Sequence, residues 1–283
     1  MAQLKNSIRQ LLETAVRSVR CPAAGELRHK RPSMAEFLIQ ALKQRAKKMP
    51  GVPLMYHSLK NLNLCHRSKN KVSKTIFTDI FKSNSFGGKD SVSGPGSDLY
   101  QTRIIIKELP ALFRDLGVST LLDIPCGDFH WMNQVISDGI DYIGADIVDE
   151  LIQNNKRKYE RRNVSFRSLD IIEDELPRVD LVFCRDCLVH LSFKQIFSTF
   201  HTICNSGSMY LLTTTFPLRK RNRDVFTGQW RPVNLQIPPF NFPEPILIIN
   251  EACPEAEGAY SDKSLGLWRI DAIQKSLAQR PLC

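Results

Sequence analysis

The sequence predicts an α/β fold built on a doubly wound, mostly parallel, seven-stranded sheet, with an N-terminal helical extension. From residue 118 onward, short apolar runs rich in Leu, Ile and Val alternate with longer amphipathic stretches, which is the rhythm of successive βαβ units. Several of these runs end in an acidic residue, as expected where parallel strands carry ligand-binding side chains to one edge of a sheet.

Each element follows from its local pattern. Apolar runs of strand length lie at 119–124, 141–147, 164–171, 179–184, 209–216, 245–251 and 265–271. Stretches with helical periodicity lie at 75–88, 98–117, 129–138, 149–161 and 192–205. The helix at 98–117 has Ser97 or Asp98 available as its N-terminal cap, and Gly117 ends it.

Charge divides the chain into two unequal parts. Residues 1–74 hold 16 Lys and Arg against three acidic residues, a net charge of +13, whereas the rest holds 23 basic and 26 acidic residues, a net charge of −3. We therefore treat residues 1–74 as a basic, helical and partly disordered extension. Residues 75–117 are predicted to form a helical cap, and residues 118–283 the domain that carries the chemistry.

The first twenty residues, MAQLKNSIRQLLETAVRSVR, place apolar side chains at three- and four-residue steps on one helical face. This Arg-rich, acid-poor start is typical of an organelle transit peptide, and it also suits a membrane-surface helix, a nucleic-acid contact or a solvated extension. No apolar run approaches the roughly 20 residues that span a bilayer. The eight cysteines lack framework spacing, so we expect free thiols in an intracellular protein, cytoplasmic or organellar.

Acidic residues follow four of the predicted strands. Asp123 ends the first strand and Asp146 the second, while Asp170 and Asp186 follow the third and fourth. Like charges gathered at one edge repel, so this arrangement is hard to explain by turn propensity alone. A ligand rich in hydrogen-bond donors and bearing a cation relieves the repulsion.

The spacing of the first two acids narrows the choice of ligand. An acid about 20 residues after a glycine-containing turn suits a ribose, because a carboxylate can accept both ring hydroxyls. The turn Pro125-Cys126-Gly127-Asp128 has neither G-x-G-x-x-G nor a Walker-type sequence, so it lacks the pattern of a pyrophosphate-binding site. A nucleoside with a positive charge fits better, and S-adenosylmethionine is such a molecule.

Four motifs carry a resemblance to a known family. LLDIPCGDF, YIGADIV, VSFRSLD and DLVFCRDCLVHLS resemble, in order and spacing, the first four motifs of class I S-adenosylmethionine-dependent methyltransferases. The resemblance covers residues 76–275 and is to a less characterised branch with D-x-P-C-G-D as its first motif. It implies a Rossmann-like methyltransferase fold. Pro125 and Phe129 stand where the family usually has glycines.

The resemblance implies a cofactor site of seven residues. Asp123 with the backbone of Cys126 and Gly127 holds the methionine end of the cofactor, and Asp146 accepts from the ribose hydroxyls. The adenine is recognised further along the chain, by the Asp170 carboxylate and the backbone N–H of Ile171. Cys184 lines the reaction centre.

The segment after the fourth strand supplies the catalytic candidates. Arg185 and Asp186 form an ion pair that shapes the pocket, while His190 is four residues after Asp186 and shares a helical face with it. His190 is then a general base or a buried structural histidine, and both interpretations stay open. The C-x-x-C-x-x-H spacing of Cys184, Cys187 and His190 is not taken as a metal site, since it has no second ligand pair.

Two loops have an open role. Residues 93–97, SGPGS, are either a lid over the site or a plain connector, because their glycines permit close backbone approach. Residues 218–223, LRKRNR, attract an acidic substrate or form an exposed basic loop.

The sequence therefore predicts a methyltransferase that transfers a methyl group from S-adenosylmethionine to a small-molecule or protein acceptor. Two alternatives remain: a non-catalytic cofactor-binding scaffold or regulatory protein, and an RNA methyltransferase recruited by the basic N-terminus. A nucleic-acid partner is not favoured, because residues 75–283 are nearly neutral and the fourth motif lacks an Asn-Pro-Pro-type sequence. The acceptor and the oligomeric state are left open.

Overall fold

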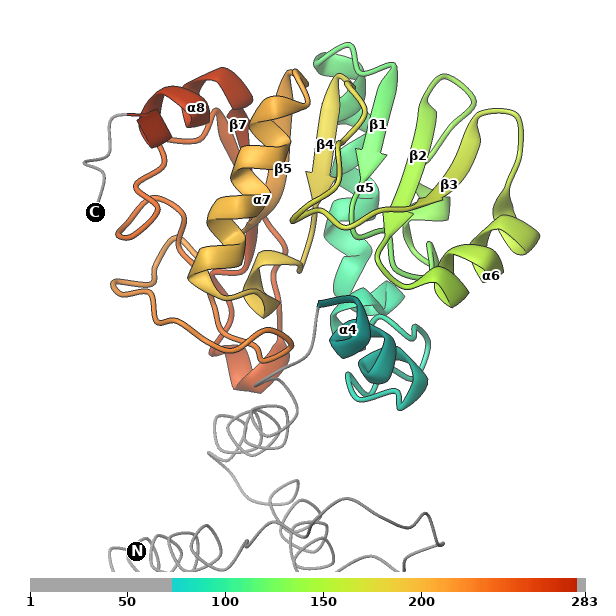
Figure 1. Cartoon of the computed structure of the whole chain (residues 1–283), viewed down its shortest axis with the longest axis horizontal. Helices are drawn as coiled ribbons and strands as arrows, with labels where there is room; N and C mark the ends of the chain where they lie inside the picture. Colours follow the sequence, from blue (N-terminus) through green and yellow to red (C-terminus); the bar gives the residue numbers. More distant parts are fainter. Residues whose placement is uncertain (1–72, 279–283) are drawn as a thin grey trace, which may run out of the picture. The chain divides into compact units, whose positions relative to one another are not determined.

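A seven-stranded sheet forms the centre of the molecule in the computed structural model, which describes residues 73–278 (Figure 1). The strand order is β3-β2-β1-β4-β5-β7-β6, with β7 antiparallel to both of its neighbours and the first five strands parallel. The strands are β1 Thr120–Asp123, β2 Asp141–Asp146, β3 Val164–Ser168, β4 Leu181–Cys184, β5 Tyr210–Thr215, β6 Leu247–Asn250 and β7 Ser264–Arg269. All seven predicted strands are present, and the predicted fold class is confirmed.

Helices cover both faces of the sheet (Figure 1). The α-helices are α4 Ser73–Lys82, α5 Leu99–Asp115, α6 Asp149–Tyr159, α7 Phe193–Asn205 and α8 Ile270–Ala278. Successive side chains of β1 point to opposite faces, as the pleat requires. Leu121 thus joins the core cluster under α5, and Leu122 joins the cluster under α7.

The predicted helix at 129–138 is wrong. The chain there is irregular and contains one short 3-10 turn, Met132–Gln134. Phe129 adopts a left-handed backbone conformation with φ +57°, which a right-handed helix cannot continue through. The apolar side chains that suggested the helix are buried in the core all the same, including Phe129, which packs against Tyr142 with ring centroids 4.7 Å apart.

The order of the strands creates a crevice. The chain leaves β1 toward β2 and β3, and it leaves β4 in the opposite direction toward β5, so the neighbouring β1 and β4 form a topological switch point. In Figure 1, α4 lies below the arrowheads of these two strands, and its residues line the same pocket as the strand ends. The fold therefore places any ligand between the carboxyl edge of the sheet and α4.

Nearly all of the predicted extension lies outside the described residues: only Ser73 and Lys74 belong to a described element, the first turn of α4. The predicted boundaries at residues 75 and 118 stay predictions. None of the helices within residues 73–278 combines the length and the apolar character that crossing a membrane needs.

Gly266 in β7 has no room for a side chain because the ring of Trp268 lies directly against it. A Cβ at Gly266 in β7 would lie 2.3 Å from the buried Trp268 ring, whose Nε1 donates to the Pro243 carbonyl oxygen at 2.8 Å. We expect Gly266→Ala to lower the free energy of unfolding by about 1–3 kcal/mol, because the ring is held and overpacking strains the core. Urea denaturation of the full chain measures the change. Gly139→Ala is the control, because a Cβ there meets nothing within 4 Å, and equal stability of the two variants would contradict the expectation.

Candidate active site

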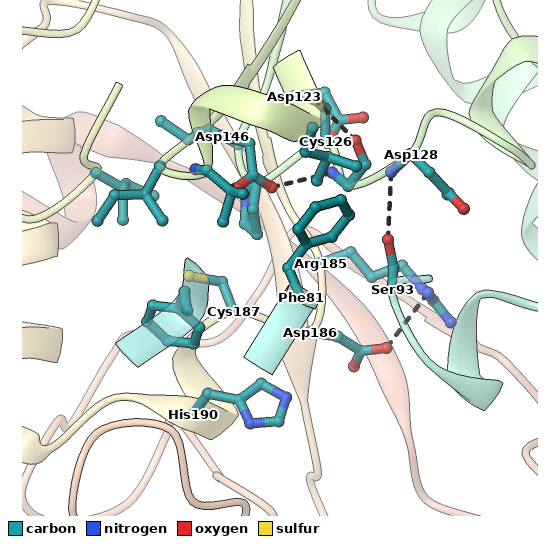
Figure 2. A pocket seen from close by; sticks show the side chains of 18 of the residues that line it. Phe81, Ser93, Asp123, Cys126, Asp128, Asp146, Arg185, Asp186, Cys187 and His190 are labelled. Atoms are coloured by element: carbon teal, nitrogen blue, oxygen red, sulfur yellow. Dashed lines mark hydrogen bonds and ion pairs between the residues drawn. The ribbon is translucent and has the colours of Figure 1, made fainter. Parts of the chain in front are cut away.

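A pocket lies at the carboxyl edge of the sheet, with a volume of about 1150 Å³ that includes its open mouth. Its walls include the turn 123–128 after β1, the residues that end or follow β2 and β3, and the segment 185–191 after β4. The apolar side of α4, the turn that follows it and the loop 91–97 complete them. Figure 2 shows the acidic turn on one side of the pocket and His190 on the other. The sequence predicted site residues in the turn after β1, at the ends of β2 and β3 and in the segment after β4; for residues 75–117 it predicted a helical cap and named no site residues there.

The turn after β1 is held by its two neighbouring strands. Ile124 N donates to the Phe183 carbonyl oxygen in β4 at 2.9 Å, and Cys126 N donates to the Ala145 carbonyl oxygen in β2 at 2.8 Å. Gly127 has φ +54°, and a Cβ at this position would lie 2.2 Å from Ser93 Oγ. Glycine is required here both for the backbone conformation and for the close approach of the 91–97 loop.

Asp123 is a buried carboxyl at the end of β1, with 2% of its surface exposed. Tyr142 Oη donates a hydrogen bond to its Oδ2 at 2.6 Å. Burial raises the pKa of Asp123 to about 8, because a low dielectric disfavours the charged form, and the nearby Asp146 adds to the rise. This carboxyl is therefore largely protonated at neutral pH.

Asp146 ends β2 and faces the same turn. Its Oδ1 accepts from Val148 N at 3.0 Å and its Oδ2 accepts from Gly127 N at 3.3 Å. Burial raises the pKa of Asp146 to about 6, and the backbone N–H donors of Val148 and Gly127 limit the rise. At neutral pH this carboxyl is ionised, and it lines the pocket as an acceptor.

Asp170 and Ile171 follow β3 and also line the pocket. Asp170 Oδ1 accepts from Ile172 N at 2.9 Å and so fixes the turn after the strand. Burial raises the pKa of Asp170 above its ordinary value. The structure thus brings the predicted acids of three successive strands to one pocket, as the parallel topology requires.

Four charged groups form a buried cluster at the end of β4. The Arg185 guanidinium pairs with Glu251 at 2.6 Å and with Asp186 at 3.3 Å. Lys263 Nζ lies 2.6 Å from Asp186 Oδ2 and 3.4 Å from Glu251 Oε2. The predicted Arg185–Asp186 ion pair is present. Glu251 directly follows β6 and Lys263 directly precedes β7, far along the chain, and no local pattern marks them as partners.

The cations of this cluster hold the Asp186 carboxylate ionised. Lys263 and Arg185 lower the pKa of Asp186 to about 2 against the opposing effect of burial. A carboxylate with so low a pKa is a poor proton acceptor at neutral pH.

His190 lies at the end of a short 3-10 turn, Leu188–His190, instead of the helix that the sequence suggested. Its Nδ1 is 2.9 Å from the Gln229 carbonyl oxygen, and its ring packs on Phe86 with centroids 4.7 Å apart. The shared helical face with Asp186 is therefore not formed. Both residues nevertheless line the same pocket.

In the C-x-x-C-x-x-H segment, Cys187 reaches the pocket and Cys184 does not. Cys184 has no exposed surface and packs in the core under α7, and its carbonyl oxygen accepts from Thr213 Oγ1 at 2.6 Å. Cys187 lines the pocket in its place. Within residues 73–278, no three His, Cys, Asp or Glu side chains are grouped as metal ligands.

Hydrogen bonds hold both ends of the loop 91–97 in place. Asp128 accepts from Ser91 Oγ at 3.0 Å and from Val92 N at 3.1 Å, and Arg185 Nη2 donates to the Gly96 carbonyl oxygen at 2.8 Å. These contacts make the loop a fixed wall of the pocket, which differs from both roles left open for it, a lid and a plain connector. Asp128 was not among the predicted site residues, although it belongs to the D-x-P-C-G-D motif.

Comparison with known proteins agrees with this geometry. Residues 122–212 match a family model described as "Methyltransferase domain". Among solved structures, the N-methyltransferase NodS from Bradyrhizobium japonicum WM9, in complex with S-adenosylhomocysteine, has a TM-score of 0.50 and 14% identity, covering 68% of this chain and 97% of that chain. No curated protein matches the sequence.

Two further solved structures are similar over part of the chain. The magnesium protoporphyrin IX methyltransferase from Synechocystis PCC 6803, with bound S-adenosylmethionine, has a TM-score of 0.43 and 17% identity, covering 55% of this chain and 82% of that chain. The methyltransferase domain of bacterial CtHen1 has a TM-score of 0.37 and 12% identity, covering 42% of this chain and 66% of that chain.

The strand order and the pocket at the switch point define a Rossmann-like methyltransferase fold. The family model matches residues 122–212, the part of the chain that bears the four motifs, and this match supports the class I S-adenosylmethionine-dependent methyltransferase superfamily. The resemblance seen in the motifs is confirmed.

Asp123 makes the stability of the protein depend on pH. The unfolded chain ionises this residue near pH 4 and the native chain near pH 8, so the native state binds the extra proton between these values. Stability therefore falls as pH rises through this window, by up to about 1.4 kcal/mol per pH unit. We expect Asp123→Asn to weaken the pH dependence of the free energy of unfolding between about pH 6 and pH 8. Urea unfolding at several pH values measures this dependence.

The control for this experiment is Asp141→Asn, at the exposed start of β2. It should leave the pH dependence of the wild type in place. An unchanged slope in Asp123→Asn would show that the buried carboxyl is already ionised at neutral pH.

Proposed function

We propose that this chain binds S-adenosylmethionine in the pocket and transfers its methyl group to an acceptor held beside the end of β4. The observation that supports this most strongly is the meeting of Asp123, Asp146 and Asp170 around the turn of Gly127, at the switch point of the sheet. The family match spans the same strands. Residues 75–117 form the cap over this site, and residues 118–283 carry the cofactor and the chemistry.

Each acid has one partner on the cofactor. Asp146 accepts from the two ribose hydroxyls with the lone pairs that Gly127 and Val148 leave. The adenine amino group donates to Asp170, and Ile171 N donates to the adenine ring. The ammonium of the methionine end pairs with Asp123, beside the backbone of Cys126 and Gly127.

The reaction is an in-line displacement. A lone pair of the acceptor attacks the methyl carbon, the carbon–sulfur bond breaks, and its electron pair stays on sulfur as S-adenosylhomocysteine leaves. Holding the nucleophile, carbon and sulfur in line is the main task of the protein, and orientation of this kind is worth about 7–11 kcal/mol. Arg185 and Asp186 shape the acceptor side of the pocket, and His190 faces the acceptor.

Calorimetric titration of the full chain with S-adenosylmethionine tests cofactor binding. We expect a dissociation constant on the order of micromolar, and a loss of at least about tenfold in Asp146→Ala, because charge-assisted hydrogen bonds to the ribose are lost. Asp141→Ala is the matched control, since Asp141 stands at the opposite end of the same strand and is exposed. Absence of binding by the folded wild type would exclude the proposal.

A bound cofactor without methyl transfer to any acceptor would instead identify a non-catalytic scaffold. The RNA methyltransferase alternative depends on the basic extension, which lies outside the described residues. It predicts RNA binding that is lost when residues 1–72 are removed.

Proton release tests the role of Asp123 separately. The protonated carboxyl of the empty site must ionise to pair with the cofactor ammonium, so binding at pH 7 should release up to about one proton. Titrations in buffers of different ionisation enthalpy measure this number. Asp123→Asn should bind more weakly and release none. Equal proton release by the variant and the wild type would assign the ionisation to another group.

A further inference from the structure

The exposed apolar side chains of this protein gather at the edge of the sheet that carries the pocket. Within residues 73–278, three of the large exposed apolar residues lie elsewhere: Met209 directly before β5, and Ile246 and Ile248 at and after the start of β6. All the others belong to segments at the carboxyl edge: Val92, Leu99, Tyr100, Leu218 and Phe226. Exposed apolar side chains concentrated in this way mark a surface that binds a partner.

The first group of these side chains stands at the mouth of the pocket. Val92, in the loop 91–97, lines the pocket and is also exposed. Leu99 and Tyr100 follow this loop as the first residues of α5, and Tyr100 is 65% exposed. The Arg103 guanidinium lies over the Tyr100 ring, 4.5 Å from its centroid, and so holds the ring at the surface.

The second group belongs to the segment 218–226, which follows β5. Leu218 is 76% exposed, and its N donates to Asp262 Oδ2 at 3.2 Å. Asp262 precedes Lys263, whose Nζ would lie 3.5 Å from a Cβ at Gly96, so the start of this segment is close to the loop 91–97. The segment thus extends the apolar surface at the pocket mouth.

Cations lie between the two apolar ends of this segment. Lys220, Arg221 and Arg223 are exposed, and none of their side chains forms an ion pair with another residue of the part that the structure describes. The acid of the segment, Asp224, turns its Oδ1 toward the backbone, where it accepts from Phe193 N at 2.7 Å and from Val225 N at 2.8 Å. The surface is therefore both apolar and positively charged.

Two asparagines fix the backbone that carries these side chains. Asn222 Nδ2 donates to the carbonyl oxygens of Asn234 at 2.8 Å and Pro238 at 2.9 Å. Asn234 Nδ2 in turn donates to the carbonyl oxygens of Pro217 at 3.0 Å and Arg219 at 2.9 Å. The segment is held from its inner side, so its outer side chains meet a partner without the cost of ordering a loop.

The combination of charge and apolar surface selects the partner. A nucleic acid or an acidic peptide would account for the cations, but phosphates and carboxylates offer nothing to an aliphatic side chain as exposed as Leu218. An anionic bilayer offers both, because its headgroups attract Lys and Arg while its acyl boundary takes up apolar side chains. It also presents the same chemistry to each of the separate segments at the pocket mouth.

We propose that the carboxyl edge of the sheet docks on a membrane surface that contains anionic lipids. Leu218 and Phe226 enter the acyl boundary, and Lys220, Arg221 and Arg223 lie beside the lipid phosphates. This position turns the mouth of the pocket toward the bilayer. The inference goes beyond the proposed function, and it is tested without cofactor or acceptor.

Sedimentation of the full chain with lipid vesicles measures the docking. The probes are vesicles of phosphatidylcholine alone and vesicles with about one-third phosphatidylglycerol. We expect the wild type to bind the anionic vesicles at least about tenfold more tightly than the neutral ones. Combining Lys220→Gln, Arg221→Gln and Arg223→Gln should weaken binding to the anionic vesicles by at least about tenfold, since each cation near such a surface contributes about fivefold.

The matched control carries the same change of charge at the opposite edge of the sheet. It combines Arg114→Gln at the end of α5, Arg162→Gln before β3 and Arg178→Gln before β4, all at exposed positions. It should bind the anionic vesicles within about threefold of the wild type. Equal weakening of binding in both triple variants would overturn the docking surface, because net charge alone would then explain the binding.

Quenching by brominated lipids tests which part of the protein reaches the bilayer. Bromine on the acyl chains quenches an indole only at close range, so Phe226→Trp should lose more fluorescence than the wild type on anionic vesicles. Met209→Trp, equally exposed but before β5, should behave as the wild type does. Equal quenching of the two variants would overturn the proposal.

The remaining outcomes also decide it. A wild type that does not bind anionic vesicles overturns the proposal. Vesicle binding that is unchanged when Lys220, Arg221 and Arg223 are replaced assigns that binding to another part of the chain and overturns it as well. Binding of RNA or polyglutamate that depends on these three cations, without vesicle binding, identifies a site for soluble polyanions instead. Titration with S-adenosylmethionine is independent of each of these results.

Discussion

The buried charge cluster of Arg185, Asp186, Glu251 and Lys263 is the constraint on which the site depends. It joins the end of β4 to β6 and β7, and through Gly96 it also holds the loop 91–97. Removing one partner of such a cluster leaves a buried charge without compensation, which costs about 3–5 kcal/mol. Because the two halves of the sheet meet between β1 and β4, the cluster fixes the segment after β4 with respect to the turn after β1.

On the proposed cofactor side, the turn after β1 is held by hydrogen bonds and close contacts with several neighbouring elements. Its backbone reaches β2 and β4, Gly127 admits Ser93, and Asp128 holds the start of the 91–97 loop. Asn155 Nδ2 adds a bond from α6 to the Gly127 carbonyl oxygen at 2.7 Å. A preorganised turn of this kind loses little conformational freedom when a ligand binds.

Local patterns were sufficient for the sheet and for the acids that end its strands, because a parallel topology carries successive strand ends to one edge. They failed where the decisive partner is distant in sequence. Phe129 takes a left-handed conformation in the packed turn, so the apolar periodicity after it does not produce a helix. Cys184 points into the core, and Glu251 reaches Arg185 from 66 residues away, which no spacing rule detects.

The raised pKa of Asp123 has a consequence for turnover. In the proposed arrangement this carboxyl ionises to pair with the cofactor ammonium, a group that S-adenosylmethionine and S-adenosylhomocysteine share. The proton is therefore given up when an empty site fills, and not when substrate becomes product. In that arrangement Asp123 contributes equally to the affinity for both molecules and does not help to release S-adenosylhomocysteine. Discrimination between them, and relief from product inhibition, must come from the walls around the sulfur.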